Sequence, residues 1–218
     1  MHSESLVISL SLHKYNSLNL VCILIGFIPV GCIALHVLEL LPLSTTAYTL
    51  ALPGLILVFI AGFLDNSVKK LALRGWLIGV IAVAFYDCSR IPFVYAGWND
   101  FVPHIGDWIL KEEGTNKLIG YSWRYIGNGG GMGITFVFLL RLIKRTHSTF
   151  LPGIVFGLFI FAALMLTLLI APHSEILMFR ITPLIVTGSL VGHLIYGGVL
   201  GLCLSFFKEK NLKRRRFI

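Results

Sequence analysis

Charged residues are scarce in this chain of 218 residues, where Asp, Glu, Lys and Arg together make up only 13% of the sequence. Hydrophobic residues make up 56%, and the mean hydropathy is +0.86. A soluble globular domain carries about 25% charged residues. The scarcity of charge therefore excludes that class and predicts a protein that lies in a bilayer.

Several motifs of well-known sites are also absent. The four cysteines form no C-x-x-C pair, so no redox site is predicted. No H-E-x-x-H is present, and no G-K-[S/T] accompanies the glycine run GYSWRYIGNGGGMG at residues 120–133. The first absence counts against a metal site of that type, and the second makes a nucleotide-binding loop a poor interpretation. We interpret the glycines as contacts for close helix packing, or as a loosened turn that lines a pocket.

Long apolar segments fill most of the chain. A transmembrane helix needs about 20 mostly apolar residues, and no stretch alternates as a barrel strand would. We therefore expect an all-α, polytopic membrane protein with about six transmembrane helices, forming a single domain over residues 1–218. The expected spans are roughly 18–41, 46–64, 71–90, 119–140, 151–171 and 182–207.

The placement of Lys and Arg predicts that both termini are cytoplasmic, as in a protein of the bacterial inner membrane. Residues 1–17 would form a cytoplasmic N-terminal segment and residues 208–218 a basic cytoplasmic tail. Such a tail directly after a span contacts anionic lipid rather than nucleic acid. Most of the 18 basic residues then lie inside: Lys14, Lys69, Lys70, Arg74, Arg141, Lys144, Arg145, Lys208, Lys210, Lys213, Arg214, Arg215 and Arg216.

The outer loop between the third and fourth spans contains the stretch FVPHIGDWILKEE. Its apolar residues Phe101, Ile105, Trp108 and Ile109 have spacings that suit one face of a helix. We expect a short interfacial helix that lies along the membrane surface at this point.

Ionisable and amide side chains gather at the outer ends of the expected spans. Asp87 and Arg90 end the third span, Arg124 and Asn128 begin the fourth, and His193 lies in the outer half of the last. A charge within a span costs about 2.5–3.5 kcal/mol, so it is retained where it faces a partner or a cavity. We take these five as candidate catalytic or binding residues of an outward-facing pocket, and expect Asp87 to pair with Arg90 or Arg124. Purely structural ion pairing is the alternative.

A second set of side chains could hold a divalent metal such as zinc or iron, because His and carboxylate ligands suit both. Two H-x-x-acid pairs and the last outer loop supply them. Their order is the reverse of the E-x-x-H order of di-iron bundles, so hydrogen-bonded structural residues are the alternative interpretation. No residues for an organic cofactor are predicted. The candidate ligands are His36, Glu39, His104, Asp107, His173 and Glu175.

A histidine in the last of six spans also occurs in rhomboid-type proteases. His193 lies in the stretch GHLIYGGVLG, residues 192–201, where Tyr196 shares its helix face. The G-x-S-G nucleophile motif of those proteases is absent from the expected fourth span. Serine proteolysis is therefore not expected.

Three classes of function remain open. The first is a membrane-embedded enzyme or binding protein that takes a lipophilic or anionic-headgroup small molecule from the outer leaflet. The second is a small transporter or channel component, although transporters place polar groups near the midplane. The third is a structural partner subunit, assembly factor or homo-oligomer. Membrane lipid is a partner in all three, nucleic acid in none, and no reaction is predicted.

Overall fold

The computed structural model describes the backbone of residues 2–112, 114–144 and 148–216, and the side chains of residues 17–112, 114–144 and 148–207. Arg145 and the side chains of Lys14 and of the basic tail lie outside this part. All regular structure in the described residues is helical. The elements are α1 (His2–Val37), α2 (Leu43–Thr46), the π-helix η1 (Ala47–Ala51), α3 (Leu52–Leu64), α4 (Asn66–Tyr95), α5 (Val102–Leu110), α6 (Lys117–Ser122), the π-helix η2 (Trp123–Gly129), α7 (Gly130–Leu142), α8 (Phe150–Ile170), α9 (Ser174–Leu177) and α10 (Pro183–Arg216).

Helical segments long and apolar enough to cross a membrane are five in number within the described residues. They are Ser17–Val37, Leu43–Leu64, Asn66–Tyr95, Phe150–Ile170 and Pro183–Phe207. These coincide with five of the expected spans. The other expected span, 119–140, lies in the helical run α6, η2 and α7, whose first half is rich in glycine and polar residues.

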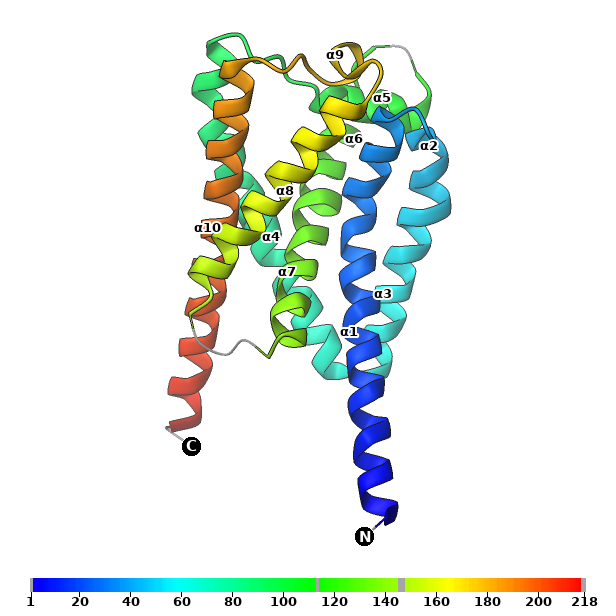
Figure 1. Ribbon diagram of the computed structural model, residues 1–218, viewed down its shortest axis with the longest axis vertical. Coiled ribbons are helices and arrows are strands. Elements are labelled where there is room, and N and C mark those ends of the chain that lie inside the picture. Colours follow the sequence, from blue (N-terminus) through cyan, green and yellow to red (C-terminus); the bar gives the residue numbers. More distant parts are fainter. Residues whose placement is uncertain (1, 113, 145–147, 217–218) are drawn as a thin grey trace.

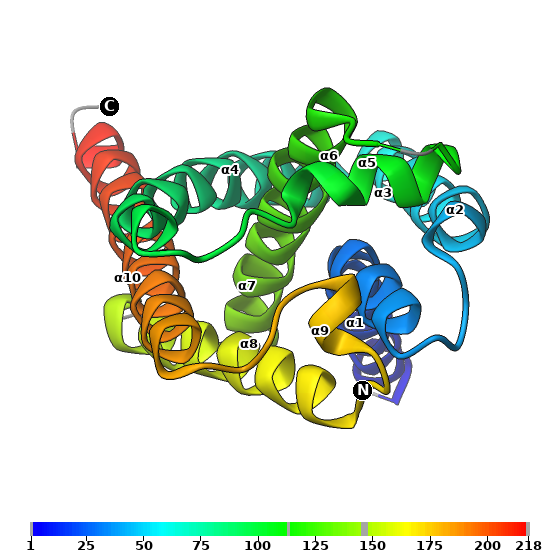
Figure 2. The same ribbon diagram turned by 90° about the horizontal axis from the view of Figure 1, so that it is seen from above.

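The long helices run side by side, with both ends of the chain at the same end of the bundle (Figure 1). The short helices α2, α5, α6 and α9 gather at the opposite end, which we call the cap end. Seen from above, α7 lies in the middle, between α4 and α1 (Figure 2).

The junction between α3 and α4 lies at the end of the bundle opposite the cap (Figure 1). Asp65 is the N-cap of α4, and its carboxylate accepts hydrogen bonds from the backbone N–H groups of Ser67 and Val68 at 2.7 and 3.3 Å. Lys69 and Lys70 follow in the first turns of the helix. The start of α4, which carries these two lysines, thus lies at the same end of the bundle as the two termini (Figure 1).

Glycine allows several pairs of helices to touch backbone to backbone, as was expected of the glycines in the run 120–133. A Cβ atom added to Gly79 of α4 would overlap the carbonyl group of Gly129 in η2. A Cβ atom added to Gly157 of α8 would overlap the carbonyl group of His193 in α10. These contacts hold η2 and α10 close to their neighbours.

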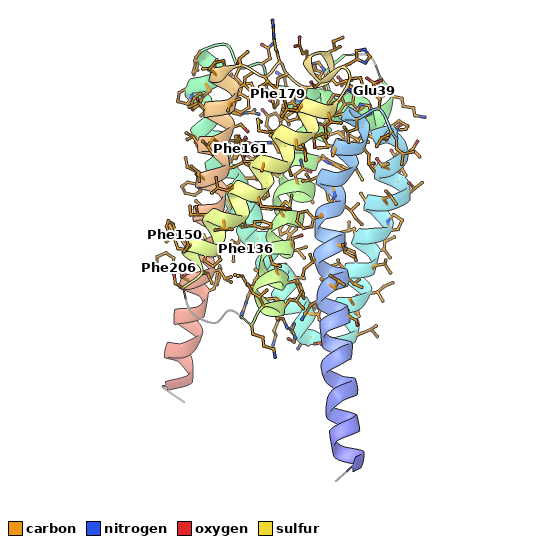
Figure 3. The ribbon with its side chains drawn as sticks, viewed as in Figure 1. Glu39, Phe136, Phe150, Phe161, Phe179 and Phe206 are labelled. Carbon is orange, nitrogen blue, oxygen red and sulfur yellow. The ribbon has the colours of Figure 1, made fainter. Side chains whose placement is uncertain are left out.

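Two hydrophobic clusters fill the interior. One surrounds α7 and includes Phe136, which lies in the middle of the bundle (Figure 3). The other lies beneath the cap and joins Ile105 of α5 to Phe179 of the α9–α10 loop. The loop between α4 and α6 contains a short helix, α5, in the stretch for which an interfacial helix was expected, and its apolar face packs against the protein, since Ile105 is fully buried.

Candidate functional site

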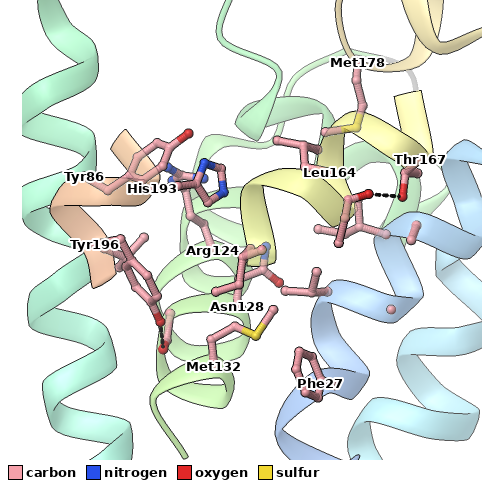
Figure 4. Close-up of a pocket in the computed structure, with 18 of the residues that line it drawn as sticks. Phe27, Tyr86, Arg124, Asn128, Met132, Leu164, Thr167, Met178, His193 and Tyr196 are labelled. Atoms are coloured by element: carbon pink, nitrogen blue, oxygen red, sulfur yellow. Dashed lines mark hydrogen bonds between the residues drawn. The ribbon is translucent and has the colours of Figure 1, made fainter. Parts of the chain in front are cut away.

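A cavity of about 350 Å³ lies inside the bundle towards the cap end (Figure 4). Helices α1, α4, α7, α8 and α10 and the π-helix η2 all contribute side chains to its walls. Most of these side chains are apolar. Its roof comes from the cap loops: Trp98, Phe101, Met178 and Phe179.

Most polar side chains around the cavity gather on one wall, which we call the polar wall; Thr167 of α8 lies apart from it, and its hydroxyl donates to the carbonyl oxygen of Ala163 (Figure 4). The polar wall consists of Tyr86 from α4, Arg124 and Asn128 from η2, and His193 and Tyr196 from α10 (Figure 4). Three of the five candidates from the sequence therefore line the cavity. The other two do not line it, but each forms an ion pair beside it: Asp87 with Arg124, and Arg90 with Asp100.

Asp87 holds Arg124 in place. This is one of the two pairings that were expected for Asp87, with Arg90 or with Arg124. Its Nε–H donates to both carboxylate oxygens, at 2.9 and 3.0 Å, and an Nη2–H donates to Oδ1. The guanidinium also lies over the ring of Tyr86, 4.9 Å from the centroid. The hydrogen bonds that Arg124 makes within the described residues involve Nε and Nη2, and none involves Nη1. The pair is neutral as a unit and leaves one donor group free.

Arg124 and Asn128 lie four residues apart on the π-helix η2, and this spacing places both side chains on one side of a helix. π-turns of this kind are frequent at functional sites. The segment Trp123–Gly129 includes Gly127 and Gly129, where no side chain resists the change of pitch. This is the loosened turn considered for the glycine run of residues 120–133.

Asn128 has an unused acceptor at the cavity. Its Oδ1 is buried, and no hydrogen-bond partner lies within reach among the described residues. Buried polar atoms nearly always have partners, so an orphaned acceptor calls for a bound group or water. The position of Asn128 in the cavity wall supplies room for one (Figure 4).

His193 has a defined tautomer when its ring is neutral. Its Nδ1 lies 2.7 Å from the carbonyl oxygen of Ser189. A carbonyl only accepts, so Nδ1 is the protonated nitrogen and Nε2 bears the lone pair. The rings of Tyr86 and Phe161 pack around it, with centroids 5.1 and 5.9 Å away. His193 therefore offers the polar wall a hydrogen-bond acceptor.

Arg90 fixes the roof rather than the polar wall. It donates to Asp100 at 2.7 Å, and Asp100 also accepts from the Tyr121 hydroxyl at 2.5 Å. The guanidinium lies 5.5 Å from the centre of a ring of Trp98, which lines the cavity. Burial alone would raise the pKa of Asp100, but the hydrogen bond from Tyr121 and the charge and hydrogen bond of Arg90 outweigh it, so the pKa is lowered.

The six candidate metal ligands do not form one group. In the described part of the chain no three His, Cys, Asp or Glu side chains lie close enough together to hold a metal ion. None of the six lines the cavity. They sit on different cap elements and have separate partners: Glu39 with His173 at 2.6 Å, His104 with Asp107 at 3.3 Å, Glu175 with Arg180 at 3.6 Å, and the ring of His36 against Trp108 at 4.6 Å.

Sequence reasoning missed the roof and part of the polar wall. Met178 and Phe179 belong to an irregular loop, where no periodic pattern marks a buried side chain. Tyr86 precedes Asp87 on α4, and only the surroundings show that its ring supports Arg124. Tyr196 could have been found, since it shares a helix face with His193; its hydroxyl donates to the carbonyl group of Gly129 at 3.1 Å.

No family model, no curated protein and no solved structure matches this chain. The chemistry of the cavity is therefore the ground on which its function is inferred.

Proposed function

We propose that this chain is a multi-pass inner-membrane protein that binds a lipophilic or anionic-headgroup small molecule in the cavity. The observation behind this is the mostly apolar cavity with a single polar wall. Ligand sites of this size combine apolar walls with a few placed polar groups. The apolar part of the ligand would lie against Phe27 and Phe159, and its head against Arg124, Asn128 and His193.

The proposed architecture has six spans, with the run α6, η2 and α7 as the fourth. Both chain ends lie at one end of the bundle, and five crossings would put them at opposite ends (Figure 1). The run packs between α4 and α1, and residues Gly129–Leu140 are almost all buried. A span enclosed by protein needs less hydrophobicity than one that faces lipid. The cap end would then be extracytoplasmic.

Reporter fusions test this topology. Fusions after Lys70 and Ile218 should report the cytoplasm, and fusions within 100–112 or 173–179 should report the outside. The same location for fusions after Tyr95 and after Leu142 would contradict a fourth crossing by the run α6, η2 and α7.

Entry from the outer leaflet would take place between α1 and α8. On this side the cavity is lined by small residues, Gly31 and Ala34 of α1 and Ala163 of α8. Ala163 is exposed on the surface that would face lipid. A Cβ atom added to Gly31 meets no atom within 4 Å, so Gly31 borders open space.

The proposal can be tested by filling the cavity at Gly31. Gly31→Leu places a side chain in the open space without a clash at Cβ, and removes a helix-interior glycine, so the fold should be retained. We expect the affinity for a lipophilic probe such as dodecanol, measured by native mass spectrometry of the purified protein, to fall by about tenfold or more.

Leu24→Phe is the matched control. Leu24 lies on the same helix, is 59% exposed and does not line the cavity. This variant enlarges a side chain on the outer face of α1 and should bind the probe like the unaltered protein. Equal binding by the Gly31 and Leu24 variants would place the probe outside the cavity and refute the proposal.

A further inference from the structure

The charges around the cavity are balanced without a ligand. Among the described residues that line it, Arg124 is the one Lys, Arg, Asp or Glu. Asp87 neutralises it through a bidentate pair, with side chains only 10% and 15% exposed. Arg90, the other buried cation nearby, is paired with Asp100. The polar wall therefore has no unpaired positive charge to offer an anion.

An anionic head group would disturb this balance. Placed at the free edge of Arg124, it would compete with Asp87 for one guanidinium and leave a net negative charge in a mostly apolar cavity. A buried charge without its own counterion is strongly unfavourable. An uncharged head has no such cost.

The hydrogen-bonding groups of the polar wall give an independent argument. Arg124 has Nη1–H groups that its pair with Asp87 does not use, whereas Oδ1 of Asn128 is an acceptor without a donor and Nε2 of neutral His193 is also an acceptor. A carboxylate or a phosphate diester only accepts hydrogen bonds, so it would present lone pairs to both. A hydroxyl group both donates and accepts, and it matches the wall.

We propose that the cavity selects an uncharged, hydroxyl-bearing lipid whose hydroxyl donates to Asn128 or His193 and accepts from Arg124. This inference rests on the proposed function, that the cavity binds an amphipathic molecule. The hydroxyl could belong to an aliphatic head, as in a fatty or prenyl alcohol, or to an aromatic head, as in a hydroquinone. Both present the same chemistry to the wall.

The test compares ligands that share one tail. Dodecanol, dodecylhydroquinone, dodecanoic acid as its anion, and dodecane are titrated onto the full chain in the same neutral detergent. We expect at least one hydroxyl ligand to bind about tenfold or more tightly than the acid. Comparison of the alcohol with the hydroquinone distinguishes an aliphatic from an aromatic head. Binding of the acid as tight as that of both hydroxyl ligands, or tighter, would overturn the inference.

Asp87→Asn tests the charge balance directly. It keeps an oxygen that accepts from Arg124 but removes the negative charge, so the polar wall gains an unpaired cation. We expect the affinity for the acid to rise by about tenfold relative to the alcohol. An unchanged preference in a folded Asp87→Asn protein would show that charge balance does not select the head group.

Asn128→Leu tests the hydrogen bond from the ligand hydroxyl to Asn128. It also provides a second test of the inference if the Asp87→Asn protein does not fold. Leu has a similar volume but no acceptor, so the affinity for the hydroxyl ligands should fall while that for dodecane is kept. An equal loss of affinity for all ligands, or no loss of affinity for any, would show that Asn128 does not accept a hydrogen bond from the ligand hydroxyl. Failure of every ligand to bind, or binding that Gly31→Leu leaves unaltered, would instead refute the proposed function itself.

Discussion

Asp87 and Arg90 lie one turn apart on α4, yet they serve two different parts of the molecule. Asp87 pairs with Arg124 of the neighbouring η2 and fixes the polar wall of the cavity. Arg90 reaches up to Asp100 in the cap loop and, through Trp98, fixes the roof. One helix end thus orients both the polar groups of the site and the cover above them.

The two ion pairs differ in how far their side chains are exposed to solvent. Both members of the Asp87–Arg124 pair are nearly buried, whereas the Asp100 side chain of the other pair is 27% exposed. Loss of a partner should therefore cost more inside the bundle than in the roof. This ordering can be measured.

The largest expected effect is that of Asp87→Ala. The change leaves the buried guanidinium of Arg124 without its counterion, and such losses cost about 3–5 kcal/mol. The free energy of unfolding, measured in mixed micelles, should fall by that amount. Asp87→Ala combined with Arg124→Ala should recover part of the loss, since the stranded charge is gone.

Strict additivity in that double-mutant cycle would mean that the two residues do not interact. Glu175→Ala is the matched control for loss of a carboxylate. Its pair with Arg180, at 3.6 Å, has both side chains more than half exposed. The free energy of unfolding of this control should change by no more than about 0.5 kcal/mol.

Local patterns in the sequence predicted much of the fold and of the polar wall. Apolar segment length marks the five helices that could cross a membrane, and helical spacing marks α5. The cost of a charge in a span predicts that Asp87 has a partner, and the glycine run predicts a loosened turn at η2. Each of these rests on neighbours in the chain or on a cost that any bilayer imposes.

Tertiary placement could not be predicted in the same way. The H-x-x-acid spacing does bring His104 and Asp107 together, since it depends on one helix alone. Whether separate pairs converge depends on how the cap loops fold, and there His173 lies against Glu39 while His36 packs on Trp108. The roof residues lie in loops without periodicity, so only the folded chain shows that they cover a cavity.

A smaller effect, confined to the roof, is expected from protonating or replacing Asp100. The folded-state pKa of Asp100 lies below its ordinary value, so its stabilising effect is complete above the ordinary carboxyl pKa near 4. It is lost as the pH falls through the lower folded value. Backbone amides of residues 98–102 should stay protected from hydrogen exchange at pH 5 and lose protection below about pH 4.

Asp100→Asn should remove this pH dependence and loosen the roof at every pH. It weakens the hydrogen bonds from Arg90 and Tyr121, at an expected cost of about 1–2 kcal/mol after allowance for the partial exposure of Asp100.

Tyr121→Phe is the milder comparison, because it removes one hydrogen bond and keeps the pair with Arg90. Its roof should still open on acidification, whereas the Asn variant should not respond. Identical exchange profiles for both variants across this pH range would show that Asp100 does not hold the roof. The cavity cover would then depend on the apolar contacts of Trp98 and Phe179 alone.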